Sequence, residues 1–193
     1  MAYQSPIELE PCKYIKIHQT IDLHGRNEDA VFNSQTKNYE VQKKIIITVN
    51  KIKYRLHEYH FHNPSEHKVN GYIYPAEIHY VFIECAEDEV DKDPQKRYDI
   101  CSCRETHDKN ILVIGRTILD KQHYTDLKNL QVKVPHFYYE YDGTLTTGNY
   151  SPVRWIIGEN PIHFHLNQID TIAKTARPLQ ELNGRILLFS ERK

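Results

Sequence analysis

A chain of 193 residues has the length of one domain and enough apolar side chains to bury a sizeable core. Its 25 lysines and arginines are balanced by 26 acidic residues, which argues against a dedicated nucleic-acid binder because such proteins usually carry a basic excess. No run of about 18 apolar residues occurs, so we expect no membrane span, and the N-terminus has no apolar signal-peptide core. We therefore expect a single domain over residues 1–193, located in the cytoplasm.

The cysteines are few for this length: Cys12, Cys85, Cys101 and Cys103. They do not indicate a disulfide framework, which fits a reducing compartment. Cys101 and Cys103 lie two residues apart, but no second pair with the spacing of a zinc site accompanies them. We interpret these two as neighbours on one face of a strand, and their role stays open.

The first part of the chain is predicted to be extended. Residues 3–21 contain two prolines, which exclude a helix. Residues 39–49 are rich in β-branched side chains and predict a strand. We expect this strand to pair with residues 52–61 through a tight turn at Asn50 and Lys51.

The next segment, residues 54–62, combines an apolar face with a histidine face. Residues two apart in a strand share a face, so Leu56, Glu58, His60 and His62 are expected on one side. Aromatic residues alternate with them and are expected to face a core.

A second strand, residues 75–83, shows the same alternation. Glu77, His79 and Val81 share one face, and large apolar residues occupy the other. The connection over residues 63–74 is rich in turn formers, so it can bring the two strands side by side. The third histidine would then face the same side as the first pair.

Three imidazoles with a vacant fourth position are typical of a catalytic zinc site, whereas a structural site closes four ligands, often thiolates. We therefore interpret His60, His62 and His79 as ligands of one Zn²⁺ ion. Zinc held in this way lowers the pKa of its bound water to about 7, so the site would hold hydroxide at neutral pH. The alternative is that they are half-buried strand residues in a chain with 12 histidines. The matching faces favour the zinc interpretation.

The second half of the chain also favours strands over helices. Strands are predicted over residues 111–118, 135–141, 153–157 and 185–189, and short helical segments over residues 121–130 and 167–175. The pattern indicates a mainly β protein (α+β in some classifications).

Motifs along nearly the whole chain resemble the alpha-class carbonic anhydrases. The histidine strands show H-F-H at 60–62, P-S-E-H at 64–67 and P-x-E-x-H-x-V at 75–81, and Y-D-G-T-L-T-T spans 141–147. Further matches follow the family order, at residues 4–7, 153–157, 177–180 and 182–185. The resemblance implies a large twisted, mostly antiparallel central sheet with a few short helices. It also implies reversible hydration of carbon dioxide to bicarbonate and a proton, by attack of zinc-bound hydroxide.

The resemblance implies carboxylates behind the zinc ligands. Glu77 matches the residue that bonds the third histidine ligand, His79. Glu58 shares a face with His60, where the animal enzymes usually have glutamine. Because a carboxylate pushes more electron density to zinc, we expect a less acidic zinc-bound water in this protein.

Thr146 matches the gatekeeper threonine of the family, and Glu66 matches the buried carboxylate that accepts its proton. One hydroxyl proton satisfies one acceptor, so Thr146 would then only accept from zinc-bound hydroxide. Glu66 also suits a turn-stabilising role, and Thr147 would line the substrate side. Carbon dioxide needs an apolar wall, and residues that match it are also plausible core residues. They are Val81, Val113, Leu145, Val153 and Trp155.

Three features depart from the family. The chain begins at its Q-S-P-I motif, so it resembles a short, N-terminally abbreviated member. The shuttle position falls near Lys37 or Thr36, and a protonated lysine shuttles protons poorly, so we expect turnover limited by proton exit and rescued by buffer. Gly148 and Asn149 replace prolines, which predicts a looser loop. A further H-x-H, His163 and His165, is interpreted as strand polars, with a proton route as the alternative.

The alternative function is a noncatalytic member that recognises polyanions or a protein partner. Such relatives include viral surface adhesins, which would place the chain on a viral particle or surface. A candidate basic patch consists of Lys43, Lys44, Lys51, Lys53 and Arg55, although such runs are commonly solvated strand faces. Relatives without catalysis generally lack at least one zinc ligand, so the complete trio favours the hydratase. A weaker alternative is a zinc protein with slow esterase-type hydrolysis.

Overall fold

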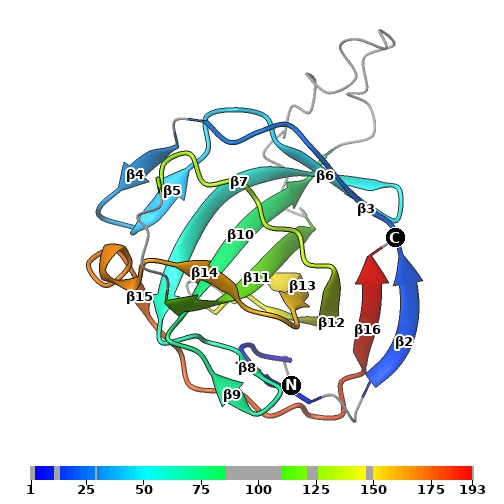
Figure 1. Ribbon diagram of the computed structural model, residues 1–193. Helices are drawn as coiled ribbons and strands as arrows, with labels where there is room; N and C mark the ends of the chain where they lie inside the picture. Colours follow the sequence, from blue (N-terminus) through cyan, green and yellow to red (C-terminus); the bar gives the residue numbers. More distant parts are fainter. Residues whose placement is uncertain are drawn as a thin grey trace, which may run out of the picture.

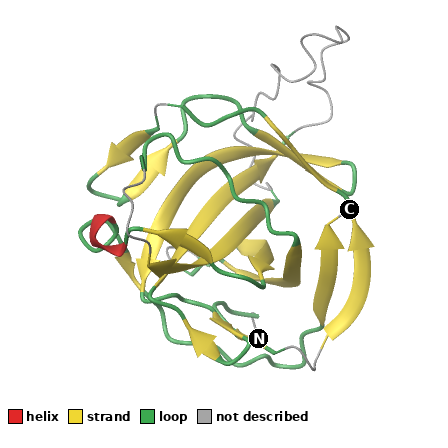
Figure 2. Cartoon of the chain, viewed as in Figure 1, coloured by secondary structure: helices red, strands yellow, loops and turns green. Residues whose placement is uncertain are grey.

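The computed structural model describes residues 3–10, 14–28, 30–85, 110–120, 126–146 and 150–192. Strands dominate these residues, as Figure 2 shows. The strands are β1 (Glu8–Leu9), β2 (Tyr14–Gln19), β3 (Ile21–His24), β4 (Val31–Asn33), β5 (Asn38–Glu40), β6 (Ile46–Val49), β7 (Ile52–Asn63), β8 (Lys68–Val69), β9 (Tyr72–Ile73), β10 (Ala76–Glu84), β11 (Ile111–Asp120), β12 (Phe137–Thr144), β13 (Pro152–Gly158), β14 (Ile162–Phe164), β15 (Lys174–Thr175) and β16 (Leu187–Arg192).

One large twisted sheet organises the molecule, in the order β2-β16-β12-β13-β11-β10-β7-β5-β4. Strands β14, β15, β6 and β3 extend it, and β1, β8 and β9 form a small second sheet. Figure 1 shows β7, β10 and β11 crossing the middle of the molecule, with β2 and β16 along one side. The pairing is mixed, since β10 is antiparallel to β7 and β11, whereas β11 runs parallel to β13. The predicted fold class is confirmed.

The hairpin between β6 and β7 has the predicted turn. Asn50 and Lys51 adopt φ values of 49° and 73°, and a tight two-residue hairpin turn requires positive φ at both central positions. The single strand predicted over residues 39–49 is, however, divided into β5 and β6. Both pair with β7, on either side of His57.

A β-bulge at His57 explains this division. Val81 on β10 pairs with Glu58, but the next residue, Phe82, pairs with Leu56. The extra residue shifts the alternation by one position, and a shift of one residue sends a side chain to the other face. Leu56 therefore packs in the aromatic core on the opposite side of the sheet, and the prediction that it shares the histidine face is wrong.

Two apolar clusters lie on the two faces of the central strands. The larger one contains Tyr59, Phe61 and Tyr80, which alternate with the histidines. The smaller one contains Val81 and Trp155, on the same face as the histidines. Each central strand is thus buried on both sides, which fixes its register because any slip would exchange the two faces.

The predicted helical segments are largely absent. Within residues 126–130 the chain forms a turn rather than a helix, and residues 121–125 lie outside the described ranges. The segment predicted over 167–175 contains a 3₁₀ turn at Leu166–Gln168 and then β15. Pairing of β15 with β7 is a tertiary contact that local sequence preference does not encode. No helix of the described residues is long and apolar enough to cross a membrane.

The cysteines were not expected to indicate a disulfide framework, but Cys85 is disulfide-bonded. The other cysteines, including Cys101 and Cys103, lie outside the described residues. Disulfides persist mainly in oxidising environments, so the cysteine count no longer argues for a reducing compartment.

Candidate metal centre

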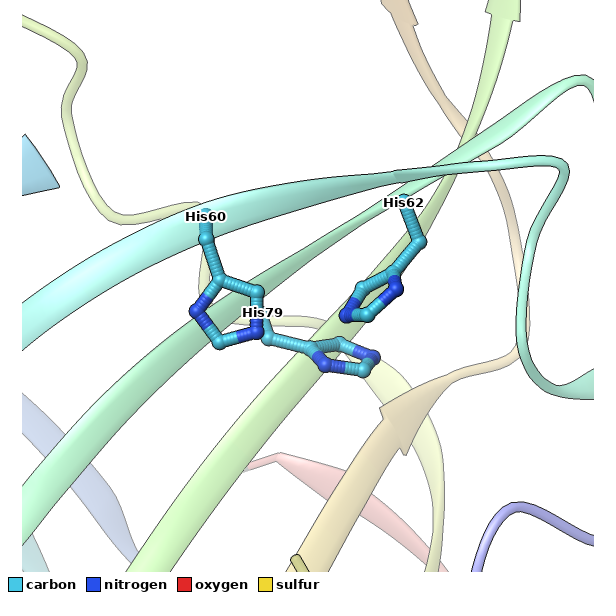
Figure 3. Close-up of side chains that lie close together, drawn as sticks. All are labelled: His60, His62 and His79. Atoms are coloured by element: carbon cyan, nitrogen blue, oxygen red, sulfur yellow. The ribbon is translucent and has the colours of Figure 1, made fainter. Parts of the chain in front are cut away.

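The pairing of β7 with β10 brings the predicted ligands together. His79 lies opposite His60, and Glu77 lies opposite His62. The ring centroids of the histidines are 4.7 to 5.4 Å apart. Each ring offers one nitrogen, and these three nitrogens lie within 4.8 Å of one another. Figure 3 shows the rings turned toward a common space, as the alternation of both strands predicted.

Carboxylates lie beside the ring nitrogens that are turned away from this space. His60 Nδ1 is 3.5 Å from Glu58 Oε1, and His79 Nε2 is 3.0 Å from Glu77 Oε1. Neither nitrogen makes a hydrogen bond within the described residues, so the role of both glutamates in fixing the orientation of the ligand rings stays a prediction.

His62 is oriented differently. Its side chain is fully buried, and Nδ1 lies 3.4 Å from Glu66 Oε1. Within the described part of the chain, Nε2 of His62 is buried and makes no hydrogen bond. A buried ring nitrogen without a partner costs free energy, and a metal ion would satisfy it.

Burial keeps the imidazoles of His60 and His62 neutral. It lowers the pKa of His60 to about 4, although Glu58 opposes this shift. It also holds the pKa of His62 well below its usual value, and the neighbouring histidines act in the same direction. Metal binding needs the neutral imidazole, so both rings can coordinate a cation at neutral pH without first losing a proton.

The carboxylates behind the rings are ionised. Burial alone would raise the pKa of Glu58, but attraction to His60 and Lys174 holds it below its usual value. Burial opposes ionisation of Glu77 too, yet His67 and His79 hold its pKa well below the ordinary range. Neutral imidazoles backed by anionic carboxylates are the donor set that suits a divalent cation such as zinc.

A buried network connects Glu77 to the start of the described chain. Its Oε2 accepts the backbone N–H groups of Glu66 and His67, each at 2.9 Å. His67 Nδ1 lies 2.8 Å from Glu77 Oε1, and its Nε2 lies 2.6 Å from the Tyr141 hydroxyl, which donates to Ser5 Oγ. Both nitrogens of His67 are thus engaged, so the alternative cluster of His67 with Glu77 and His79 is a supporting network rather than a second metal site.

Tyr141 and Ser5 carried no role predicted from the sequence, although both lie in the Y-D-G and Q-S-P-I motifs. Gly115, which lies opposite His79 on β11, was not predicted either. A Cβ atom at Gly115 would lie 2.7 Å from Glu77 Oε1 and 2.6 Å from Ile157 Cδ1. Only glycine leaves room for the carboxylate there.

Glu66 is buried beside the metal centre. The backbone N–H of Arg177 donates to its Oε1 at 2.9 Å, and Oε2 lies 3.9 Å from His79 Nδ1. Oε2 makes no hydrogen bond within the described residues. Thr146 is also buried, and its hydrogen bond to Glu66 stays a prediction, for which Oε2 is the available acceptor. Thr147 lies outside the described residues.

The predicted apolar wall is gathered in one cluster. Val81, Val113, Val153 and Trp155 are buried together, and Leu145 packs against them. The indole ring of Trp155 lies 4.9 Å from the ring of His79, centroid to centroid. Trp155 therefore borders the metal centre, and the role of the cluster as a wall for the substrate stays a prediction.

The predicted shuttle position is occupied by an engaged lysine. The amine of Lys37 donates a hydrogen bond to the backbone oxygen of Ala173, 2.8 Å away. The residue that follows Ala173 is Lys174, which β15 aligns with His62 on β7. No motif indicated Lys174, because it lies three residues before the R-P match and reaches the centre only through strand pairing.

A comparison with protein families matches residues 1–191 to the eukaryotic-type carbonic anhydrases. A carbonic anhydrase of Pectobacterium atrosepticum is 23% identical over 206 residues, which cover 96% of this chain and 79% of that protein. Alpha carbonic anhydrase 6 of Arabidopsis thaliana is 37% identical over 82 residues, which cover 40% of this chain and 32% of that protein.

Solved structures show the same fold. The alpha-carbonic anhydrase of Thermovibrio ammonificans, in complex with sulfanilamide, has a TM-score of 0.68 at 23% identity, covering 96% of this chain and 86% of its own. Dioscorin in complex with ascorbate has a TM-score of 0.75 at 18% identity, covering 99% of this chain and 87% of its own.

Proposed function

Because the chain belongs to the eukaryotic-type carbonic anhydrase family, we propose that it hydrates carbon dioxide reversibly to bicarbonate and a proton, at a zinc ion held by His60, His62 and His79. The observation that carries this proposal is the buried trio of imidazoles, with one nitrogen from each within 4.8 Å of the others. The neutral state of His60 and His62 and the orphaned Nε2 of His62 support a metal at this position.

A zinc ion bound there would supply a Lewis acid that lowers the pKa of a water in the open position to about 7. The chain supplies the geometry around it. Glu58 and Glu77 orient the rings of His60 and His79 from behind. The register of β7 and β10 holds all three ligands on one face, so little rearrangement is needed on binding.

Thr146 and Glu66 align the attack. We assign Thr146 as donor to Glu66 Oε2, a buried oxygen that accepts no hydrogen bond within the described residues and so is available to it. Its single proton is then committed, and its oxygen can only accept a hydrogen bond from the attacking oxygen. That requirement orients a lone pair toward carbon dioxide.

The apolar wall receives the substrate. Carbon dioxide has no charge and no hydrogen-bond donor, so it is held best by apolar side chains beside the reactive oxygen. Trp155 and Val81 support this role because they are packed on the same face as the ligands.

The test is stopped-flow hydration of carbon dioxide combined with metal analysis. We expect about one zinc per chain, loss of activity on treatment with a chelator, and recovery when zinc is returned. His79→Ala should lose both zinc and activity, because two nitrogens hold zinc far more weakly than three. His136→Ala is the matched control, since that side chain is 58% exposed and lies beside Glu191. A fully zinc-loaded protein without activity would refute the proposal.

A noncatalytic binding role is the second candidate. The fold likeness to dioscorin, solved with ascorbate, supports it. The candidate basic patch supports it less, because Lys43 forms an ion pair with Glu28. Purified protein that lacks zinc, gains no activity on zinc addition and still binds a sulfated polysaccharide would favour this role.

A further inference from the structure

Lys174 lies on the metal-facing side of the sheet. Strand β15 runs parallel to the end of β7 and places Lys174 opposite His62. Residues aligned on neighbouring strands project to the same face, and His62 projects toward the metal centre. The side chain of Lys174 therefore starts beside a metal ligand.

The charge of Lys174 acts on the carboxylates of the metal centre. Glu58 and Glu66 both attract its amine. Burial lowers the pKa of the Lys174 amine, whereas the two carboxylates favour its protonated form.

The backbone under Lys174 is fixed from two directions. The amine of Lys37 donates to the carbonyl oxygen of Ala173, the residue before Lys174. The side-chain amide of Asn63, at the end of β7, donates to Asp170 Oδ1 at 2.9 Å. These contacts hold β15 against β7, so the lysine is placed by the fold rather than by a mobile loop.

We propose that Lys174 is a specificity residue that attracts small monoanions, bicarbonate among them, to the open position of the metal centre. This inference rests on the proposed function for the position of the metal. Glu58 and Glu66 place negative charge at the centre and would repel an anion, and Lys174 offsets that repulsion. Carbon dioxide is neutral, so its binding gains nothing from the lysine.

The direct test uses the cobalt-substituted protein with azide as the anion probe. Azide binding is followed through the visible absorption of cobalt, in wild type, Lys174→Met, Lys174→Arg and Lys53→Met. We expect Lys174→Met to weaken azide binding about 3- to 10-fold, because the variant removes one positive charge that lies beside a metal ligand. Lys174→Arg should stay close to wild type. High salt should reduce the difference because it screens the charge.

Lys53→Met is the matched control. Lys53 is half-buried like Lys174 and lies on β7 itself, but it is nine residues from His62, about 30 Å along the strand. Its removal should leave azide binding unchanged. Equal azide affinity in wild type and Lys174→Met overturns the inference, and so does an equal loss in Lys53→Met. Cobalt content and thermal unfolding of each variant exclude a folding defect.

Kinetics in the two directions provide a second readout. Lys174→Met should raise the KM for bicarbonate about 3- to 10-fold while the KM for carbon dioxide stays unchanged. An equal rise in both would overturn the inference. An inactive protein whose azide affinity still depends on Lys174 refutes the proposed function and supports the inference. An active enzyme whose azide affinity does not depend on Lys174 supports the proposed function and refutes the inference. A chain that takes up no cobalt refutes both the proposed function and the inference.

Discussion

Glu58 places a negative charge directly behind one metal ligand. Its Oε1 lies 3.5 Å from His60 Nδ1, and the side-chain amide of Asn38 donates to its Oε2. Burial would favour the neutral acid, but attraction to His60 keeps the pKa of Glu58 below its usual value. The anion increases the basicity of His60 and should make a metal at this site less acidic.

We expect Glu58→Gln to lower the pH midpoint of carbon dioxide hydration. The neutral amide keeps a hydrogen-bond acceptor beside His60 but removes the charge, so less electron density reaches the metal. Zinc affinity should fall by about 10-fold, the lower end of the range for such partners. The measurements are pH–rate profiles and competition with a chelating dye. Glu84→Gln, at the far end of β10, is the control. A midpoint that stays or rises would contradict this account.

The neutral state of His60 predicts how stability depends on pH. Its pKa is about 4 in the folded protein, against about 6.5 in an unfolded chain. Between these values the unfolded chain binds a proton that the folded chain does not, so the free energy of unfolding falls as pH falls. His62 acts in the same direction. Glu58 and Glu77 have lowered pKa values and so lose their contribution only below about pH 4.5.

We therefore expect the metal-free protein to lose about 2 kcal/mol of stability through His60 between pH 6.5 and pH 5. Urea unfolding at a series of pH values measures this loss. His60→Gln should flatten the curve, because no buried base remains to resist protonation. His136→Gln changes an exposed histidine and should leave the slope as it is. A His60→Gln protein with the wild-type slope would show that the ring is not held neutral by burial.

At the scale of elements, the contact between β10 and β11 is tightest at Gly115. It lies opposite His79, in a position where a Cβ atom would meet both Glu77 Oε1 and Ile157 Cδ1 at less than 3 Å. Overfilling such a site forces side chains off their rotamers or moves the backbone. Because Glu77 supports a metal ligand, the effect should reach the site as well as the core.

Gly115→Ala should cost about 1 to 3 kcal/mol of stability and weaken zinc binding by about 10-fold or more. The double variant Gly115→Ala with Ile157→Val removes one of the two clashes, since valine lacks Cδ1. It should regain part of the stability but not the zinc affinity, because the contact with Glu77 remains. Denaturant unfolding and zinc competition separate the two effects. Zinc affinity that recovers together with stability would show that the carboxylate is not displaced.

Strand periodicity was enough to predict the face of Glu58, His60 and His62, because alternation depends only on local backbone geometry. It failed at Leu56, since the bulge at His57 shifts the alternation and carries no signal in the sequence. The motifs predicted which residues gather at the site, including Glu66.

Strand periodicity and motifs did not predict the residues that reach the metal centre through pairing of strands far apart in the sequence. Lys174 was expected in a helical segment, and it lies beside His62 only because β15 adds to the edge of β7. Gly115 has no side chain that could mark a site in the sequence. It matters because Ile157 Cδ1 and Glu77 Oε1 lie 2.6 and 2.7 Å from the position that a Cβ atom would take. Both depend on the packing of the whole sheet rather than on any local pattern.

At the scale of the whole molecule, the described residues bury the ligand side chains. His62 and His79 are at most 1% exposed, and apolar clusters pack on both faces of the strands that carry them. A proton released at the centre therefore needs a carrier to reach solvent. Lys37, at the predicted shuttle position, has its amine bound to the carbonyl of Ala173, and a lysine is mostly protonated at neutral pH in any case.

We expect imidazole to raise the turnover of carbon dioxide hydration at saturating substrate, while kcat/KM stays constant. A small base with a pKa near the working pH can accept the proton that Lys37 does not carry. Stopped-flow assays at fixed ionic strength, with increasing imidazole, measure the effect. Lys37→Gln should change turnover little, because the amine anchors Ala173 rather than transferring protons. The opposite result would be a turnover that does not change with imidazole and is lost in Lys37→Gln. It would show that the lysine itself carries the proton and that proton exit does not limit this protein.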